Sequence, residues 1–377
     1  MWSHGNIEIP TFELDSSIVR LDRGFVGSTL TTSPALVSTN TLSFGPLEFL
    51  DAMTRTKLVD EPSFMERLFH GFFHVYDLRN ILIRTRQGTL RFDSDGRDRV
   101  RDDERTTVSK RIGHALTYLL GMKIRNHRHI VDFGKACEEH YGVTAPVSNE
   151  PRPDFVGSGN GFASGEILES KGHLLAPGRV LSWKTDLKEA LRDQVDAGLV
   201  RLQGTTVQRG WAVSTVLRER RDSHDSAIAY SDPVRDDLRT RPPSPSRRHR
   251  MVDLHYAVWA ATVGQRELTR LLLGESGGNL VIVQGDEVEW MKKRWFIPRS
   301  DCPLVPAGIW AGGLELELAE RLGNDQDLFT DYVWPRTLER EEGVILRDAS
   351  ALVSTLSSKH MRSREIVFRR SRNRRRV

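Results

Sequence analysis

Three polar side chains in one short stretch have the types and spacing needed to hold a divalent cation beside a phosphodiester. Asp154 follows Pro153, and after a spacer of fourteen residues come Glu169, Ser170 and Lys171. Two carboxylates are hard oxygen ligands of the kind that Mg²⁺ or Mn²⁺ takes, and the backbone carbonyl of Ser170 adds another. Such a cation lowers the pKa of an attacking water and neutralises the charge that develops during hydrolysis. The stretch therefore predicts metal-dependent hydrolysis of a phosphodiester.

The positions of these side chains follow from a predicted β-hairpin. Two short apolar runs, Phe155–Val156 and Ile167–Leu168, flank a stretch rich in Gly and Ser, which is typical of two strands joined by a wide turn. Side chains alternate between the faces of a strand, so Glu169 and Lys171 share one face and Ser170 lies on the other. When the strands pair, the acid at the start of the first strand comes close to the same face. The alternative is a solvated cross-strand pair beside an ordinary turn.

The stretch from residue 152 to 172 resembles the active-site signature of the PD-(D/E)xK nuclease superfamily, which includes many restriction endonucleases and recombination nucleases. The matching residues are Pro153-Asp154 and Glu169-Ser170-Lys171. A second copy of the short motif, Asp186-Leu187-Lys188, falls in a helical pattern, whereas the first copy follows an apolar run and a turn. The resemblance implies that Lys171 contacts the scissile phosphate or the attacking water, and that the two carboxylates bind the metal.

Further site residues follow from this resemblance. In related nucleases a polar residue of the helix after the hairpin approaches the catalytic centre, and Gln194 has that place here. A hydrogen-bonded core glutamine is the alternative. Relatives often draw another acidic ligand from the first helix of the core. The sequence leaves that ligand open among Glu138, Glu139, Glu150 and His114.

The elements that would position these residues form a nuclease-like domain over residues 106–238. The apolar periodicity predicts a first helix on the face of Val108–Leu119, with Thr106 or Thr107 as its cap. A second helix over Ile130–Tyr141 ends at Gly142, and a strand at Val143–Val147 precedes the hairpin. After the hairpin come a helix over Thr185–Leu199 and a strand over Trp211–Leu217. This order resembles the common core of the superfamily. We therefore expect an α/β (α+β) protein with a restriction-endonuclease-like core, in which helices flank a mixed central sheet.

Residues 1–105 are predicted to form an N-terminal accessory region that contains β-structure. The local patterns predict β-like runs at Ser17–Leu21 and Ala35–Val37, a helix through Phe64, Leu68 and Phe72, and a hairpin over Leu82–Phe92. His70 and His74 lie one turn apart on that helix. They form an alternative pair of metal ligands with no third ligand in view.

The C-terminal part is predicted to be an accessory region joined by a linker. Residues 239–250 are basic and Pro-rich, which is typical of a linker or exposed loop. Residues 251–360 are expected to be mainly helical, with helices at about Val252–Leu273 and Leu314–Arg321 and a strand at Asn279–Gln284. Residues 361–377 form a basic tail with eight arginines. Such a tail contacts polyanions, and a solvated, disordered end is the alternative.

Composition restricts the class of protein. The chain has 377 residues, which is long enough for two domains, and a net charge of +4. Hydrophobic residues make up 38% and charged residues 28%, which is usual for a soluble protein. It has no apolar run of about eighteen residues and no signal-peptide pattern, so we expect neither membrane insertion nor secretion. Cys137 and Cys302 are the only cysteines. This argues against a disulfide framework, fits a reducing cytoplasm, and leaves oxygen or imidazole groups to hold any metal.

The leading hypothesis is a cytoplasmic, Mg²⁺- or Mn²⁺-dependent DNA endonuclease. The resemblance suggests a role in bacterial defence or DNA repair. RNA is not excluded as substrate, and protein partners or a homodimer stay open. One alternative is a catalytically inactive nucleic-acid-binding or assembly subunit that keeps the nuclease-like fold, favoured by the basic linker and tail. A weaker alternative is an α+β protein in which the motif is accidental.

Overall fold

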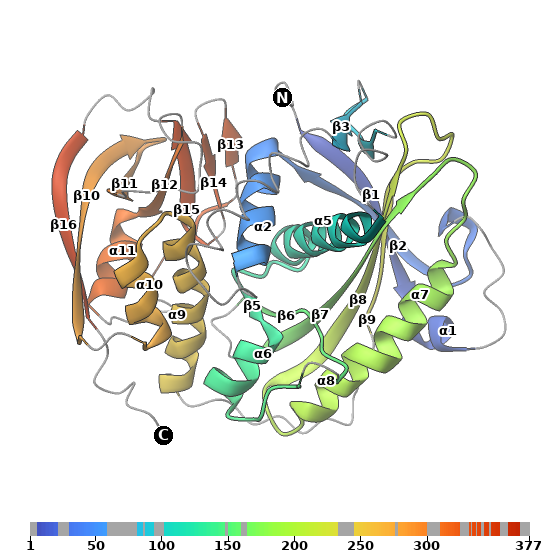
Figure 1. Cartoon of the computed structure of the whole chain (residues 1–377), viewed down its shortest axis with the longest axis horizontal. Helices are drawn as coiled ribbons and strands as arrows, with labels where there is room; N and C mark the ends of the chain where they lie inside the picture. The colour runs from blue at the N-terminus through green and yellow to red at the C-terminus, as the bar shows by residue number, and fades with distance from the viewer. Residues whose placement is uncertain are drawn as a thin grey trace. The chain divides into compact units, whose positions relative to one another are not determined.

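The computed structural model describes residues 6–21, 30–58, 81–85, 87–93, 102–147, 150–159, 164–232, 245–275, 278–299, 310–324, 332, 334–336, 338–340, 343–346, 348–354 and 361–369 (Figure 1). The chain divides into two compact units. The first comprises Met1–Thr56 with His74–Ser244, and the second Lys57–Phe73 with Pro245–Val377. The predicted helix through Phe64, Leu68 and Phe72, with its histidine pair His70 and His74, lies outside the described residues.

The first unit is built on a mixed sheet. Among the described residues it has seven strands in the order β2-β1-β9-β8-β7-β6-β5. The pairs β1–β9 and β7–β8 are parallel and the other neighbours antiparallel. The strands are β1 (Ile7–Asp15), β2 (Leu36–Phe44), β5 (His129–Asp132), β6 (Phe155–Ser158), β7 (Gly165–Leu175), β8 (Val207–Arg218) and β9 (Ala227–Asp232). The expectation of an α/β protein with a mixed central sheet is confirmed.

Helices lie on both faces of this sheet (Figure 1). The helix α5 packs on one face, where Thr117 hydrogen-bonds Ser170 of β7. The continuous helical segment α7-η3-α8 packs on the opposite face, where Gln194 bonds Lys171 of the same strand. The helical segments of this unit are α1 (Ser16–Arg20), η1 (Leu30–Thr32), α2 (Pro46–Leu58), α5 (Asp102–Lys123), α6 (Phe133–Ala136), η2 (Cys137–Tyr141), α7 (Trp183–Glu189), η3 (Ala190–Val195) and α8 (Asp196–Arg201).

The main core of the first unit lies between the sheet and α5. Ile112, Leu116 and Leu119 recur on one side of the helix and pack with Leu168 and Trp211 of the sheet. The spacing of three and four residues is what an amphipathic helix needs to bury one stripe. The predicted helical face is thus confirmed, although the helix begins at Asp102 rather than at a threonine cap.

The predicted helices and the hairpin occur as α5, α6-η2, β6 with β7, and α7-η3-α8, followed by the strand β8, but the first strand was misplaced: it is β5, which precedes α6-η2. Val143–Val147 is not a strand, and Ile130 belongs to β5 rather than to the following helix. The helix starts after Asp132, whose carboxylate accepts a hydrogen bond from the Lys135 amide at 2.8 Å. This cap separates strand from helix, and Gly142, at φ +65°, ends the helix as predicted.

The N-terminal strands are part of the same sheet. β1 pairs in parallel with β9 and antiparallel with β2, so residues 1–105 contribute two strands to the central sheet. The predicted β-run at Ser17–Leu21 is wrong, because Ser16–Arg20 forms α1. Asp15 caps this helix by accepting a hydrogen bond from the Ser17 amide at 2.8 Å. The hairpin predicted over Leu82–Phe92 is confirmed by β3 (Leu82–Arg84) and β4 (Leu90–Phe92), which pair antiparallel.

The second unit is dominated by strands, so the expectation of a mainly helical C-terminal region is wrong. Its described strands form an antiparallel sheet of seven, in the order β13-β14-β15-β12-β11-β10-β16. They are β10 (Leu280–Trp290), β11 (Lys293–Pro298), β12 (Trp310–Glu315), β13 (Leu338–Arg340), β14 (Gly343–Ile345), β15 (Ser350–Ser354) and β16 (Met361–Arg369). The helices are α9 (Pro245–Thr262), α10 (Arg266–Leu273) and α11 (Leu316–Gly323). Across the described ranges, no helix has both the length and the apolar composition that crossing a bilayer requires.

Three boundaries in this unit differ from expectation. The proposed linker 239–250 overlaps α9, which begins at Pro245, because a proline fits the first turn of a helix. The single helix predicted over Val252–Leu273 is interrupted between α9 and α10, where Gly264 has φ +75°. The basic tail begins as a strand, since Met361–Arg369 is β16 and pairs with β10. Residues 370–377 lie outside the described residues.

The helix α5 crosses the strand β7 at an unusually short distance. A Cβ atom added to Gly172 would lie 2.0 Å from the carbonyl oxygen of Ser109 in α5, and one added to Gly113 would lie 2.9 Å from the Cα of Gly172. Because these are backbone atoms, a side chain at either position would push the helix away from the strand. The two glycines therefore set the separation between α5 and β7.

We expect Gly172→Ala to lower the free energy of unfolding by about 1–3 kcal/mol, the usual cost of overpacking, as measured by urea denaturation. Gly121→Ala on the same helix is the control. Its Cβ meets the side-chain atom Cδ1 of Ile130 at 3.0 Å, which can move, and alanine favours a helix over glycine by about 1 kcal/mol. Equal stability of Gly172→Ala and the wild-type protein would contradict the close crossing.

Candidate functional site

The candidate site lies where β7 continues beyond the end of β6. The antiparallel pair β6–β7 runs from Gly157↔Glu166 to Phe155↔Leu168. From Glu169 onward, β7 is bordered by β8 on one side, and Asp154 takes the place of a strand on the other. The carboxylate oxygen Oδ2 of Asp154 accepts a hydrogen bond from the Ser170 amide at 2.8 Å. A side chain thus completes the hydrogen bonding of a strand edge.

Side chains alternate along β7 as the sequence predicts. Glu169 and Lys171 share the face covered by η3, with Lys171 Nζ 3.1 Å from Glu169 Oε1 and 2.5 Å from Gln194 Oε1. Ser170 lies on the other face, where its hydroxyl accepts a hydrogen bond of 3.0 Å from Thr117 of α5. The structure therefore brings the predicted residues Glu169, Lys171 and Gln194 into direct contact, with Asp154 at the adjoining strand edge.

Asp154 is held as a carboxylate by groups that come mainly from α5. The ring of His114 packs edge-on against Phe155, and its Nε2 lies 3.1 Å from Asp154 Oδ1. Burial alone would raise the pKa of Asp154, but His114, the Ser170 amide and the charge of Lys110 outweigh it and lower the pKa below its ordinary value. The group is therefore ionised at neutral pH.

The pKa of Glu169 is shifted in the opposite direction. Its side chain is 1% exposed. Burial and the neighbouring charge of Asp154 raise its pKa well above the ordinary value, although Lys171 opposes them. Within the part of the chain that the structure describes, its oxygen Oε2 is buried without a hydrogen-bond partner. A buried carboxyl oxygen without a partner is costly, and a bound cation would remove that cost.

The donors present suit a hard divalent cation. Asp154 and Glu169 offer carboxylate oxygens. The amide and carbonyl of one residue in an extended strand point to the same side, so the Ser170 carbonyl faces the edge that holds Asp154. Among the described residues, no group of three or more His, Cys, Asp or Glu side chains gathers to hold a metal. Two carboxylates fit Mg²⁺, which is usually bound by one or two carboxylates with water and substrate phosphates completing its shell.

The structure also separates the four alternatives for a further ligand. Glu138 and Glu139 are exposed on η2, and Glu150 forms an ion pair of 2.5 Å with Arg201. His114 is the one that the structure places against Asp154. In the described structure His114 therefore contacts the Asp154 carboxylate, and this contact takes up the ring nitrogen Nε2 that could otherwise bind a metal.

Sequence reasoning missed four side chains beside this site. Lys110 lies one helical turn before His114 on α5, and its spacing of four residues was the available signal. His173 continues the alternation of Glu169 and Lys171 along β7, and it lies 3.0 Å from Asp186 of α7. The hydroxyl of Ser214 in β8 also donates to Asp186. Asp186 thus connects α7 with β7 and β8, and no local sequence pattern predicts such a contact.

The chain matches no protein-family model, and its comparison with curated proteins and with solved structures also yields no match. Inference about function therefore starts from the geometry of the site and from the motif.

The raised pKa of the buried Glu169 carboxyl predicts a pH-dependent gain of stability in Glu169→Gln. A carboxyl group whose pKa is raised on folding destabilises the protein increasingly as pH rises above the unfolded value, by about 1.4 kcal/mol per pH unit up to the folded pKa. The neutral amide escapes this cost. We expect the variant to be more stable than wild type at pH 7 in EDTA, and the difference to vanish as pH falls toward the ordinary value of 4.5.

Urea denaturation at pH 4.5, 6 and 7.5 measures this difference. Glu166→Gln is the contrasting control, because Glu166 bonds His127 and Arg125 and its pKa is lowered to about 2 despite burial. That variant should lose stability at neutral pH. A Glu169→Gln variant less stable than wild type at pH 7.5 would mean that Glu169 is ionised in the folded protein.

Proposed function

We propose that the first unit is a metal-dependent nuclease that hydrolyses phosphodiester bonds of DNA. The observation that carries the proposal is the juxtaposition of an ionised Asp154 and a buried Glu169 at one strand edge, with the ammonium group of Lys171 beside them. A cation at this edge would satisfy both carboxylates, and a phosphate bound to it would lie next to a positive charge.

The fold supports the same proposal. The chain order α5, β5, α6-η2, β6, β7, α7-η3-α8 and β8, on a mixed sheet with helices on both faces, resembles a restriction-endonuclease-like core. The motif residues stand just before β6 and in β7, on neighbouring strands. DNA as substrate and a setting in defence or repair rest on the motif resemblance, and RNA is tested as substrate in the same assays. A cytoplasmic location rests on the cysteine usage.

Mg²⁺ or Mn²⁺ would be held by Asp154, Glu169 and the carbonyl of Ser170. When bound, the metal supplies an activated water and charge stabilisation for the phosphoryl group. His114 orients Asp154 through its 3.1 Å contact. Lys171 binds a non-bridging phosphate oxygen or the attacking water, and Gln194 fixes the position of its ammonium group.

A second candidate is a nucleic-acid-binding subunit that does not turn over substrate. It is favoured by the lack, among the described residues, of a third metal-ligating side chain in the group, and by the exposed Arg362 and Arg369 of β16. This candidate requires binding that weakens with salt, without metal-dependent cleavage.

Cleavage assays separate the two candidates. We expect the wild-type protein with Mg²⁺ to cleave plasmid or single-stranded DNA, and Asp154→Asn and Lys171→Gln each to lose at least about 100-fold in rate, the loss typical of removing a group that stabilises transition-state charge. Lys188→Gln changes the lysine of the other Asp-x-Lys sequence and should cleave normally. Equal rates for all variants would remove the hairpin residues from the mechanism.

Metal binding can be tested without turnover. Binding of Mg²⁺ to the folded state should raise the unfolding free energy of the wild-type protein by about 2.7 kcal/mol at one hundred times the dissociation constant. Asp154→Asn should lose this stabilisation. Differential scanning fluorimetry with Mg²⁺ against EDTA gives the readout, and an identical shift in wild type and variant would place the metal elsewhere.

A further inference from the structure

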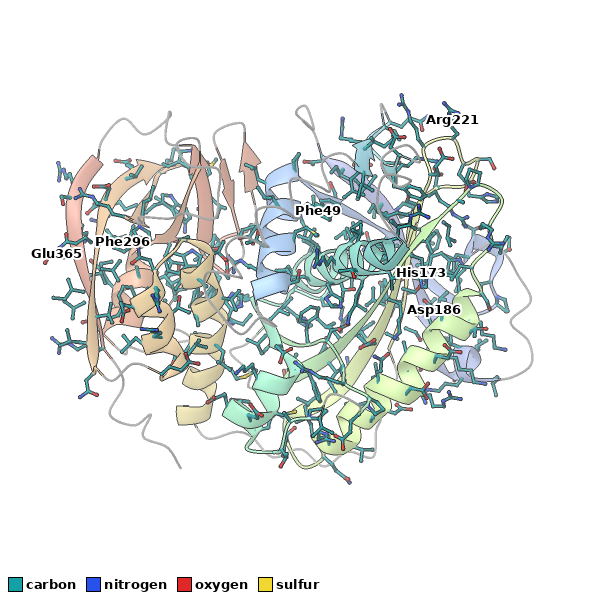
Figure 2. The ribbon with its side chains drawn as sticks, in the orientation of Figure 1. Phe49, His173, Asp186, Arg221, Phe296 and Glu365 are labelled. Atoms are coloured by element: carbon teal, nitrogen blue, oxygen red, sulfur yellow. The ribbon has the colours of Figure 1, made fainter. Side chains whose placement is uncertain are left out.

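The polar face of β7 does not end at the proposed metal site. His173 follows Glu169 and Lys171 on the same face, one strand repeat of about 6.6 Å beyond Lys171. Opposite it stands Asp186 of α7, whose oxygen Oδ2 lies 3.0 Å from Nε2 of His173 (Figure 2). The same oxygen accepts a hydrogen bond from the hydroxyl of Ser214, which is fully buried in β8. Three elements thus fix the position of one imidazole.

The arrangement leaves one side of the ring available. His173 is 28% exposed, unlike Asp186 and Ser214. Its Nε2 contacts Asp186, whereas Nδ1 has no hydrogen-bond partner among the described residues. When both ring nitrogens carry a proton, Nε2 donates to Asp186 and Nδ1 is a donor for a ligand. The Asp186 side chain is 14% exposed, so the ring is the more accessible of the two groups.

We propose that His173, oriented by Asp186, binds the phosphate next to the scissile one, in a nucleic acid strand that runs along β7. The inference rests on the proposed function, since Lys171 takes the scissile phosphate. It deepens that function by naming the substrate class, a polynucleotide with consecutive phosphates. A substrate with one isolated phosphodiester reaches Lys171 but not His173.

The proposed contact depends on the charge of His173. The titratable groups that the described residues place on this face are Glu169 and Lys171 on β7, Asp186 on α7 and Asp193 on η3, which interacts with Lys171. The strand β8 adds the uncharged Ser214. A cationic side chain at position 173 can donate to a phosphate oxygen, whereas a neutral acceptor cannot. Affinity for a polynucleotide should therefore depend on a donor at this position.

The test is binding of a fluorescein-labelled oligothymidylate of about twelve nucleotides, within the usual site size, followed by anisotropy. Ca²⁺ replaces Mg²⁺ to prevent turnover. His173→Gln should bind roughly tenfold more weakly than wild type, as expected for loss of one charge-assisted hydrogen bond. His173→Lys, which keeps a cation, should retain affinity.

A matched histidine provides the control. His224 also contacts an aspartate, Asp222, at 3.0 Å, but in the turn between β8 and β9. His224→Gln should bind the oligonucleotide as tightly as wild type. A second readout is hydrolysis of bis(p-nitrophenyl) phosphate with Mg²⁺, which has one phosphate and should proceed at similar rates in wild type and His173→Gln.

The outcomes distinguish the two proposals. An affinity of His173→Gln equal to that of wild type, while DNA is still cleaved, overturns the phosphate contact and leaves the nuclease proposal standing. Loss of affinity in His173→Gln with rescue by lysine, but no metal-dependent cleavage by wild type, supports the contact and overturns the nuclease. Failure of lysine to rescue, with His173→Gln folded, assigns His173 a packing role and overturns the contact.

Discussion

The repulsion between two buried acids at one strand edge is the interaction on which the candidate site depends. Asp154 and Glu169 lie close enough for the charge of one to raise the pKa of the other. The surrounding groups shift the two acids in opposite directions, lowering the pKa of Asp154 and raising that of Glu169. Each is secured from a different side of the sheet, Asp154 by His114 of α5 and Glu169 by Lys171, which Gln194 of η3 holds in place. The sheet therefore lies between the groups that stabilise Asp154 and those that stabilise Glu169, while the two acids themselves meet at its edge.

Two glutamates of β7, three residues apart, show how local contacts decide charge. Glu166 accepts hydrogen bonds from His127 and Trp211, each at 2.9 Å, and Arg125 stacks over the indole ring at 3.8 Å. These donors outweigh burial and lower the pKa of Glu166 to about 2. Glu169 has Lys171 in contact, the more distant charge of Lys110, one neighbouring acid and, among the described residues, an oxygen without a hydrogen-bond partner. The Glu166 carboxylate is thus fully paired within the protein, whereas the described donors and cations around Glu169 do not suffice to stabilise its ionised form, and a bound cation would supply that stabilisation.

The sequence predicted those features that depend on local periodicity. The alternation of Glu169, Ser170 and Lys171 and the apolar stripe of α5 follow from strand and helix geometry. It failed where context decides. The strand β5 runs directly into a helix and was read as part of it, and the C-terminal strands alternate too irregularly to be recognised. The contact between His173 and Asp186 depends on where α7 packs, which no spacing encodes.

The parallel pair β1–β9 has a consequence for how the chain assembles. The hydroxyl of Ser231 in β9 bonds the carbonyl of Leu14 in β1, 217 positions away. By contrast, α5, the hairpin, α7-η3-α8 and β8 follow one another along the chain. On the ribosome, the first strand to be synthesised must therefore wait for β9, the last strand of its sheet, before it can form this pair, while the elements around Glu169 already have their neighbours. The face that carries Glu169 is thus assembled from the middle of the unit, and the β1–β9 pair completes the sheet.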